Sequence, residues 1–126
     1  MHVMDAVMAR RSVRKFMPEG LEKSVIEKLI DAAVHAPNAA NSQNWAFGVI
    51  QDAGRLREYS SRIKEDLLAH VDRFEWLARY KEMLADPEYH IFYNAPALVI
   101  IFSKPGGIMA KENCCLAAEN LMLAAC

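Results

Sequence analysis

The chain has 126 residues, a length that fits one domain, and 53% of them are hydrophobic while 25% are charged. This balance favours a packed core and excludes an intrinsically disordered chain. The 15 basic and 16 acidic residues give a formal net charge of -1. A chain without a basic field is not expected to bind nucleic acid, because that binding depends on many phosphate contacts.

Helical periodicity predicts a short helix over Val3–Arg10 and an amphipathic helix over Leu21–His35. Pro37 is expected to end the second helix, because the residue before a proline avoids the helical region. A polar loop, Asn38–Asn44, then leads into Trp45–Ile50, whose alternating and then apolar pattern predicts a strand.

A second helical region opens at Gly54 and keeps apolar residues at helical spacing as far as Leu68. A third helix is predicted over Phe74–Leu84. The apolar run Ala97–Phe102 lies between two prolines and predicts a strand buried on both faces. A final helix, rich in Ala, Leu and Met, is predicted over Ile108–Cys126.

The predicted elements leave apolar surface that needs a neighbour. Two strands alone form a marginal sheet. The last helix carries apolar side chains nearly all round, and such a helix must be buried. We therefore expect either that the chain pairs with a second copy or that it is incomplete.

Other features argue against membranes, disulfides and metals. No stretch approaches the ~20 apolar residues needed to span a bilayer, and the first residues lack the order of a signal peptide. The three cysteines include the adjacent pair Cys114 and Cys115, which fits neither a disulfide framework nor zinc spacing. The four histidines show no ligand spacing. We expect a cytoplasmic protein with no membrane partner and no metal.

The segment Arg10-Arg11-Ser12-Val13-Arg14 places three guanidinium groups and a hydroxyl at the end of the first predicted helix. Guanidinium forks beside a hydroxyl suit a phosphate or another multi-oxygen anion. A solvated cluster that complements the helix dipole is the alternative. By residue type alone, Asn38, Asn41 and Gln43 in the following loop are better explained as turn formers.

Two segments together resemble the nitroreductase family of flavin mononucleotide (FMN) enzymes. The first runs from Asp5 to Phe16 and contains the arginine cluster, and the second runs from Ala32 to Trp45 and contains the polar loop. Weaker matches are Asn94–Ala97, which leads into the second strand, and the helix from Glu112 to Cys126. The resemblance covers nearly the whole chain in the right order.

This resemblance implies a nitroreductase-like α+β fold: one domain over residues 1–126, with a mixed central sheet flanked by helices, in an intertwined homodimer. Relative to the family, the chain is expected to lack the usual C-terminal portion, which holds a Gly-rich loop, a further strand and a basic residue that grips the phosphate. The resemblance also implies FMN as cofactor, NAD(P)H as reductant and a small-molecule electron acceptor.

The resemblance assigns the cofactor-binding residues. Arg10 and Ser12 would contact the phosphate, Arg14 would lie near the N1/C2-carbonyl edge of the flavin, and Arg11 would contribute through its backbone or side chain. The Pro37–Asn41 loop would reach the flavin ring of the partner's site. The loop residues assigned in this way are Pro37, Asn38, Ala39, Asn41 and Gln43. The family commonly has serine at position 38 and proline at position 44, and this chain has asparagine at both.

The function implied is an oxidoreductase that passes electrons from NAD(P)H through FMN to an electron-poor acceptor such as a nitroaromatic or a quinone. Since the flavin performs the electron transfer, no side chain is assigned a catalytic acid–base role. Two alternatives stay open. One is a non-catalytic dimeric remnant of the same fold, and the other is different flavin chemistry, such as reductive dehalogenation or flavin fragmentation.

Overall fold

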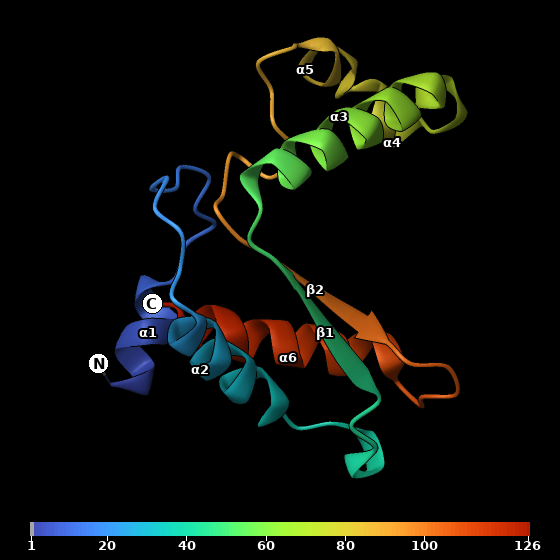
Figure 1. Ribbon diagram of the computed structural model, residues 1–126. Coiled ribbons are helices and arrows are strands. Elements are labelled where there is room, and N and C mark those ends of the chain that lie inside the picture. The colour runs from blue at the N-terminus through green and yellow to red at the C-terminus, as the bar shows by residue number, and fades with distance from the viewer. Residues whose placement is uncertain (1) are drawn as a thin grey trace. The chain divides into compact units, whose positions relative to one another are not determined.

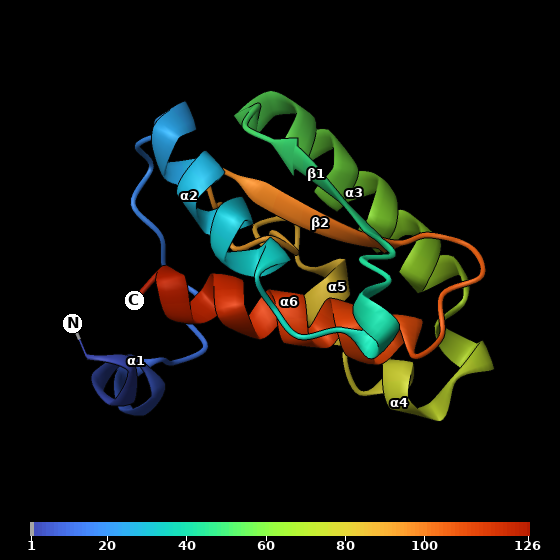
Figure 2. The same ribbon diagram turned by 90° about the horizontal axis from the view of Figure 1, so that it is seen from below.

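The computed structural model describes residues 2–126 (Figures 1 and 2). In chain order its elements are α1 (Val3–Ala9), α2 (Lys23–Val34), the 3-10 helix η1 (Ala39–Asn41), β1 (Trp45–Ile50), α3 (Ala53–Ala69), the 3-10 helix η2 (Val71–Arg73), α4 (Glu75–Ala78), α5 (Lys81–Ala85), β2 (Leu98–Ser103) and α6 (Ala110–Ala124). The described helices include none that is long and apolar enough to cross a membrane.

The chain forms two compact units. Unit 1 comprises the residues up to Ser12 together with Leu21–Val49 and Val99–Cys126, and unit 2 comprises Val13–Gly20 and Ile50–Leu98. Each unit has its own cluster of buried side chains. The chain therefore contains two separately packed regions.

Unit 1 is built on the pairing of α2 with α6, which lie side by side in both views (Figures 1 and 2). Ala33 and Ala117 are completely buried between them, since small side chains allow close approach of two helices. The Asn120 amide donates a hydrogen bond to the Ala32 carbonyl at 3.1 Å. Trp45 and Ala36 complete the buried cluster, so the first strand is fixed against the helix pair.

The sheet of residues 2–126 has two strands, β1 and β2. They run antiparallel (Figure 1), and the Lys104 amide, just after β2, donates to the Asn44 carbonyl, just before β1, at 3.0 Å. The bounds of β1 are those expected. The expectation that β2 is buried on both faces is wrong, because β1 is its one neighbouring strand among the described residues and Phe102 is half exposed. The mixed sheet implied by the resemblance is likewise not formed by these residues.

Unit 2 is organised around α3. The helix begins after Asp52, whose carboxylate accepts a hydrogen bond from the Arg55 amide at 2.9 Å, as expected of an aspartate N-cap. Val71, Leu77 and Leu84 form the buried cluster. The Lys64 ammonium donates to the carbonyls of Asp86 and Tyr89 at 2.6 and 2.7 Å, which fastens the segment after α5 to α3.

Unit 2 has two short helices where the sequence predicted one. The predicted helix over Phe74–Leu84 is broken between α4 and α5, where the Tyr80 amide donates to the Leu77 carbonyl three residues back, at 2.9 Å. Such a bond closes a tight 3-10 turn in place of the α-helical pattern. The last helix also differs from expectation. Its described bounds are Ala110–Ala124, and its apolar residues Leu116 and Met122 are exposed.

Candidate functional site

The arginine–serine segment begins where α1 ends, in unit 1. The Arg11 guanidinium donates to the carbonyls of Met8 and Arg10 at 2.8 and 2.7 Å. These carbonyls are among those that a helix end leaves without an intrahelical partner. Arg11 therefore caps α1, which is one of the two roles that the sequence allowed for this cluster.

Arg10 points to α6 instead. Its Nε atom lies 3.7 Å from Oε1 of Glu119, and both side chains are partly exposed. An exposed ion pair of this length stabilises a protein by at most about 1 kcal/mol. A doubly charged phosphate group competes easily with one carboxylate at such a pair. Arg10 is thus held by one weak, accessible ion pair, and Ser12 is exposed.

The Pro37–Gln43 loop has an unusual backbone. Ala40, Asn41 and Gln43 all adopt left-handed conformations, with φ of 54°, 49° and 49°. Asparagine tolerates this region, whereas alanine and glutamine do so at a cost of about 1–2 kcal/mol each. Strained non-glycine residues of this kind cluster at ligand-binding sites and persist because the surroundings impose them.

The surroundings that impose this conformation are two asparagines. Asn113 on α6 is 3% exposed. Its amide oxygen accepts the Ala39 N–H at 3.0 Å, and its amide nitrogen donates to the Ile108 carbonyl at 3.1 Å. Within the loop, the Asn38 side chain accepts the Gln43 N–H at 2.8 Å and donates to the Ala36 carbonyl at 3.3 Å. The loop is thus clamped at both ends.

The arginine segment and the loop lie at different points along α6. Arg10 contacts Glu119, whereas the loop is anchored at Asn113, six residues earlier (119 minus 113). Six helical residues correspond to about 9 Å along the axis. Figures 1 and 2 show α1 and η1 towards opposite ends of α6. One chain therefore does not bring these two groups of predicted residues together.

Arg14 belongs to unit 2, where it contacts an aromatic pair. Its guanidinium carbon is 5.9 Å from the centre of the Tyr93 ring, and the Tyr89 and Tyr93 rings meet edge to face at 6.1 Å. Hydrogen bonds from Tyr89 and then from Arg14 lower the pKa of Tyr93. Burial, followed by the hydrogen bond to Tyr93, raises the pKa of Tyr89. The Arg14 guanidinium therefore lies over the ring of one member of this aromatic pair.

The sequence model of the nitroreductase family matches residues 7–126. This chain belongs to the nitroreductase family. A nitroreductase from Bacteroides fragilis, solved with bound FMN, superposes with a TM-score of 0.85 at 30% identity, covering 99% of this chain and 64% of that one. The two share the nitroreductase-like α+β fold.

Curated relatives include more than one activity. A protein described as a putative NADH dehydrogenase/NAD(P)H nitroreductase from Methanothermobacter thermautotrophicus is 28% identical over 99% of this chain. An iodotyrosine deiodinase from Danio rerio is 30% identical over 79% of it. The chain spans 56% and 35% of the lengths of these two relatives.

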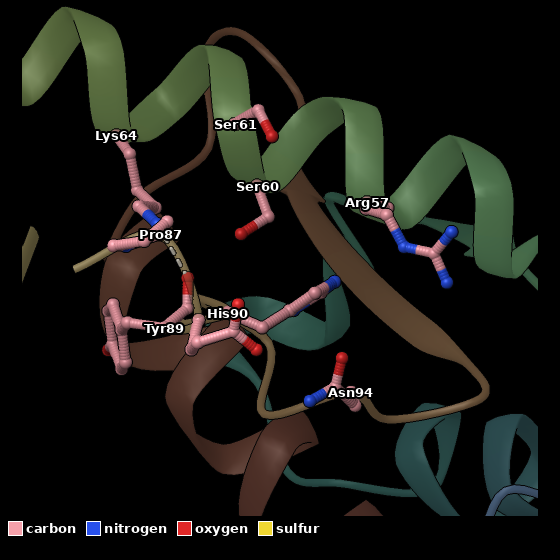
Figure 3. Close-up of a pocket in the computed structure, with 9 residues that line it drawn as sticks. Arg57, Ser60, Ser61, Lys64, Pro87, Tyr89, His90 and Asn94 are labelled. Carbon is pink, nitrogen blue, oxygen red and sulfur yellow. Dashed lines mark hydrogen bonds between the residues drawn. The ribbon is translucent and has the colours of Figure 1, made fainter. Parts of the chain in front are cut away.

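Three features of this nitroreductase-family chain lie outside the predicted set. Asn113 was not predicted because a single asparagine in an apolar helix has no distinctive pattern. Tyr93 was not predicted because it is far from Arg14 in the sequence. The third feature is a polar hollow in unit 2 that includes Arg57, Lys64 and His90 (Figure 3). Each depends on contacts between distant residues, which periodicity does not encode.

Proposed function

We propose that the protein is an FMN-dependent oxidoreductase that acts as a homodimer. In this proposal it takes electrons from NAD(P)H and passes them to an electron-poor small molecule, such as a nitroaromatic or a quinone. Membership of the nitroreductase family and the FMN bound in the Bacteroides fragilis relative support the cofactor. The name of the Methanothermobacter relative supports NAD(P)H as the reductant.

The observation that carries the proposal is the clamped, left-handed loop of residues 37–43. Left-handed alanine and glutamine cost a protein stability, and we infer that the hydrogen bonds hold the loop in this shape to present it to a ligand. Pro37, Asn38, Ala39, Asn41 and Gln43 form the surface proposed to face the flavin ring. Asn38 and Ala39 contribute through the backbone that their hydrogen bonds hold in place.

The remaining contacts are assigned to the arginine segment. Arg10 and Ser12 bind the phosphate in this proposal, since a guanidinium and a hydroxyl donate to phosphate oxygens. Arg11 supports them by capping α1. When bound, FMN supplies the hydride and electron transfer. Arg14 provides a fixed positive charge for the ring, where added negative charge must be stabilised.

A homodimer accounts for the distribution of these residues. Because the arginine segment and the loop are anchored at different points on α6, two copies are proposed to combine the segment of one with the loop of the other. The exposed apolar residues of α1 and α6 support such a contact; they include Val3, Met4, Met8, Leu116 and Met122. Light scattering at micromolar concentration is expected to give at least the dimer mass, and a monomer mass would exclude the arrangement.

The visible spectrum of the purified protein tests the cofactor. We expect flavin absorption bands in the protein as isolated, or saturable quenching of FMN fluorescence on titration. The released flavin should be the mononucleotide, since no Gly-x-Gly-x-x-Gly turn follows a strand in the sequence. A colourless protein that does not bind added FMN would favour the alternative of a non-catalytic remnant.

Arg14→Ala tests the residue assignment. Loss of one charge-assisted contact is expected to weaken FMN binding about tenfold, equivalent to about 1.4 kcal/mol. Lys15→Ala is the matched control, because it removes a neighbouring exposed charge without an assigned role. Equal affinities of the two variants would contradict the role of Arg14.

Reductive dehalogenation is a second candidate, favoured by the 30% identity to an iodotyrosine deiodinase. The same holoprotein can be offered a nitroaromatic, a quinone and 3-iodotyrosine under one reducing condition. Turnover of the iodinated substrate alone would favour the deiodinase activity. Turnover of the nitroaromatic or the quinone alone would favour the first proposal.

A further inference from the structure

Unit 2 contains a polar hollow of about 290 Å³ between α3 and the segment that follows α5 (Figure 3). Arg57, Ser60, Ser61 and Lys64 line it from the helix, and Tyr89, His90 and Asn94 are among the residues that line it from the segment. A second hollow, of about 200 Å³, shares Arg57, His90 and Asn94. The two hollows therefore adjoin along one wall.

The first hollow is lined by hydrogen-bond donors. The Ser60 hydroxyl is buried and accepts the Ile91 N–H at 3.0 Å, so its own proton stays available to donate. His90 accepts the Phe92 N–H at Nδ1, at 3.1 Å. In the neutral ring the proton is then carried by Nε2, which becomes a donor. In Figure 3 the His90 ring extends into the space between Arg57 and Asn94.

The charge of the lining is positive. The lining has two basic side chains, Arg57 and Lys64, and one carboxylate, Glu88. Lys64 is held by two carbonyls, whereas Arg57 has no ion pair or hydrogen bond within residues 2–126. Arg62, further along α3, is paired with Glu58 at 3.7 Å. An unpaired guanidinium beside several neutral donors suits a carboxylate or phosphate oxygen.

The second hollow supplies an apolar surface. Its lining includes Pro18, Ala53, Leu56, Ala95 and Pro96. Pockets that hold small molecules usually measure about 300–1,000 Å³ and combine apolar walls with a few polar groups. The second hollow combines both kinds of lining but is smaller than this range, whereas the adjoining pair together reaches it.

We propose that the two hollows together bind an organic carboxylate, with its charged end at Arg57 and its apolar body against Leu56 and the prolines. Tyr93 and Asn94, which stand at or beside the shared wall, have left-handed conformations, with φ of 52° and 55°. The site is formed by unit 2 alone and does not depend on flavin binding.

His90 provides the measurement. Burial, and then the charges of Arg57 and Lys64, lower its pKa. A bound carboxylate offsets these two charges, so it should raise the pKa of His90. The chain has four histidines, and the NMR signal of His90 can be assigned with His90→Gln. We expect sodium benzoate to raise the pKa of His90 relative to sodium chloride at equal ionic strength.

Matched variants and probes test each part of the site. Arg57→Gln should weaken benzoate binding about tenfold from an affinity of about 1 mM, while Arg62→Gln should leave it unchanged. Benzamide lacks the charge and should not bind. Acetate and inorganic phosphate lack the apolar body and should bind more weakly than benzoate.

Three results would overturn the proposal. The first is an unchanged His90 pKa at saturating benzoate in protein that keeps its native spectrum. The second is equal weakening by Arg57→Gln and Arg62→Gln, which would indicate a general effect of charge. The third is binding of acetate or phosphate as tightly as benzoate, which would indicate a simple anion site without the apolar half.

Discussion

Asn113→Ala should separate the conformation of the Pro37–Gln43 loop from the stability of α6. The substitution leaves the Ala39 N–H and the Ile108 carbonyl without their partner on α6. A buried donor left unsatisfied costs about 1–3 kcal/mol, and a lost hydrogen bond to an accessible carbonyl costs about 0.5–1.5 kcal/mol. Ala39 is half-buried and Ile108 is exposed, so we expect a total loss of about 2–3 kcal/mol.

Asn120→Ala is the matched control. Asn120 lies on the same helix and donates one hydrogen bond, to the Ala32 carbonyl, so its loss should cost about 1 kcal/mol. Both variants replace asparagine by alanine within α6, and the gain in helix propensity of about 0.5 kcal/mol is common to them. The difference between the two variants therefore reports the loop contact.

Urea unfolding followed by fluorescence measures this difference. The chain has two tryptophans, of which Trp45 is in the core of unit 1 and Trp76 is in unit 2. A Trp76→Phe background leaves Trp45 as the reporter of unit 1. A lower midpoint with an unchanged slope indicates a change in stability. Equal losses for Asn113→Ala and Asn120→Ala would refute the assignment of Asn113 as the anchor of the loop, as would unchanged FMN affinity in Asn113→Ala.

Three further predictions follow from the strained loop, the core of unit 2 and His90. Ala40→Gly should raise the free energy of unfolding by about 0.5–1 kcal/mol, because glycine removes the left-handed strain. The control Ala39→Gly should lower the free energy of unfolding. A lower melting temperature for Ala40→Gly would contradict the presence of strain at Ala40. Leu84 lies in the buried cluster of unit 2, so Leu84→Ala should lower the free energy of unfolding in urea by about 2–4 kcal/mol. If the exposed-site control Met83→Ala lowers it more than Leu84→Ala does, the cluster is not a core. The pKa of His90 is lowered from its ordinary 6.5, so the unfolded chain binds more protons and stability should fall as the pH drops through 6.5, levelling off below the folded pKa. His90→Gln should flatten this dependence, and an identical pH profile in the variant would contradict the shift.

The sequence predicted most elements because their periodicity is strong. The β1 strand has the expected bounds, and α3 covers the predicted helical region. The break between α4 and α5 could not be predicted in the same way. Leu77 and Leu84, the residues that pack inward, are seven positions apart, which is nearly two full helical turns. A continuous helix and a broken one therefore give the same apolar pattern.

Some features of the candidate site follow from residue types, whereas others depend on contacts between residues that are distant in the sequence. Residue types singled out Arg10 and Ser12, because guanidinium and hydroxyl groups suit an anion, whereas the polar loop was assigned only through the family resemblance. The left-handed conformation of Ala40 was not predictable, since alanine favours helix and the hydrogen bond from Ala39 to Asn113 spans 74 positions. The same holds for Tyr93 and Arg14, which meet only in the folded unit.

The arrangement of α6 supports the proposed homodimer on physical grounds. Its buried residues are Asn113 and Ala117, while Leu116 and Met122 are exposed. Cys114, Ala117 and Leu121 pack against the core of unit 1, so α6 turns one apolar stripe inward, as expected of a helix on a core. The two asparagines face inward because each bonds to backbone of unit 1, and the larger apolar side chains are left for another surface. In the proposed homodimer a second copy would cover these exposed apolar side chains.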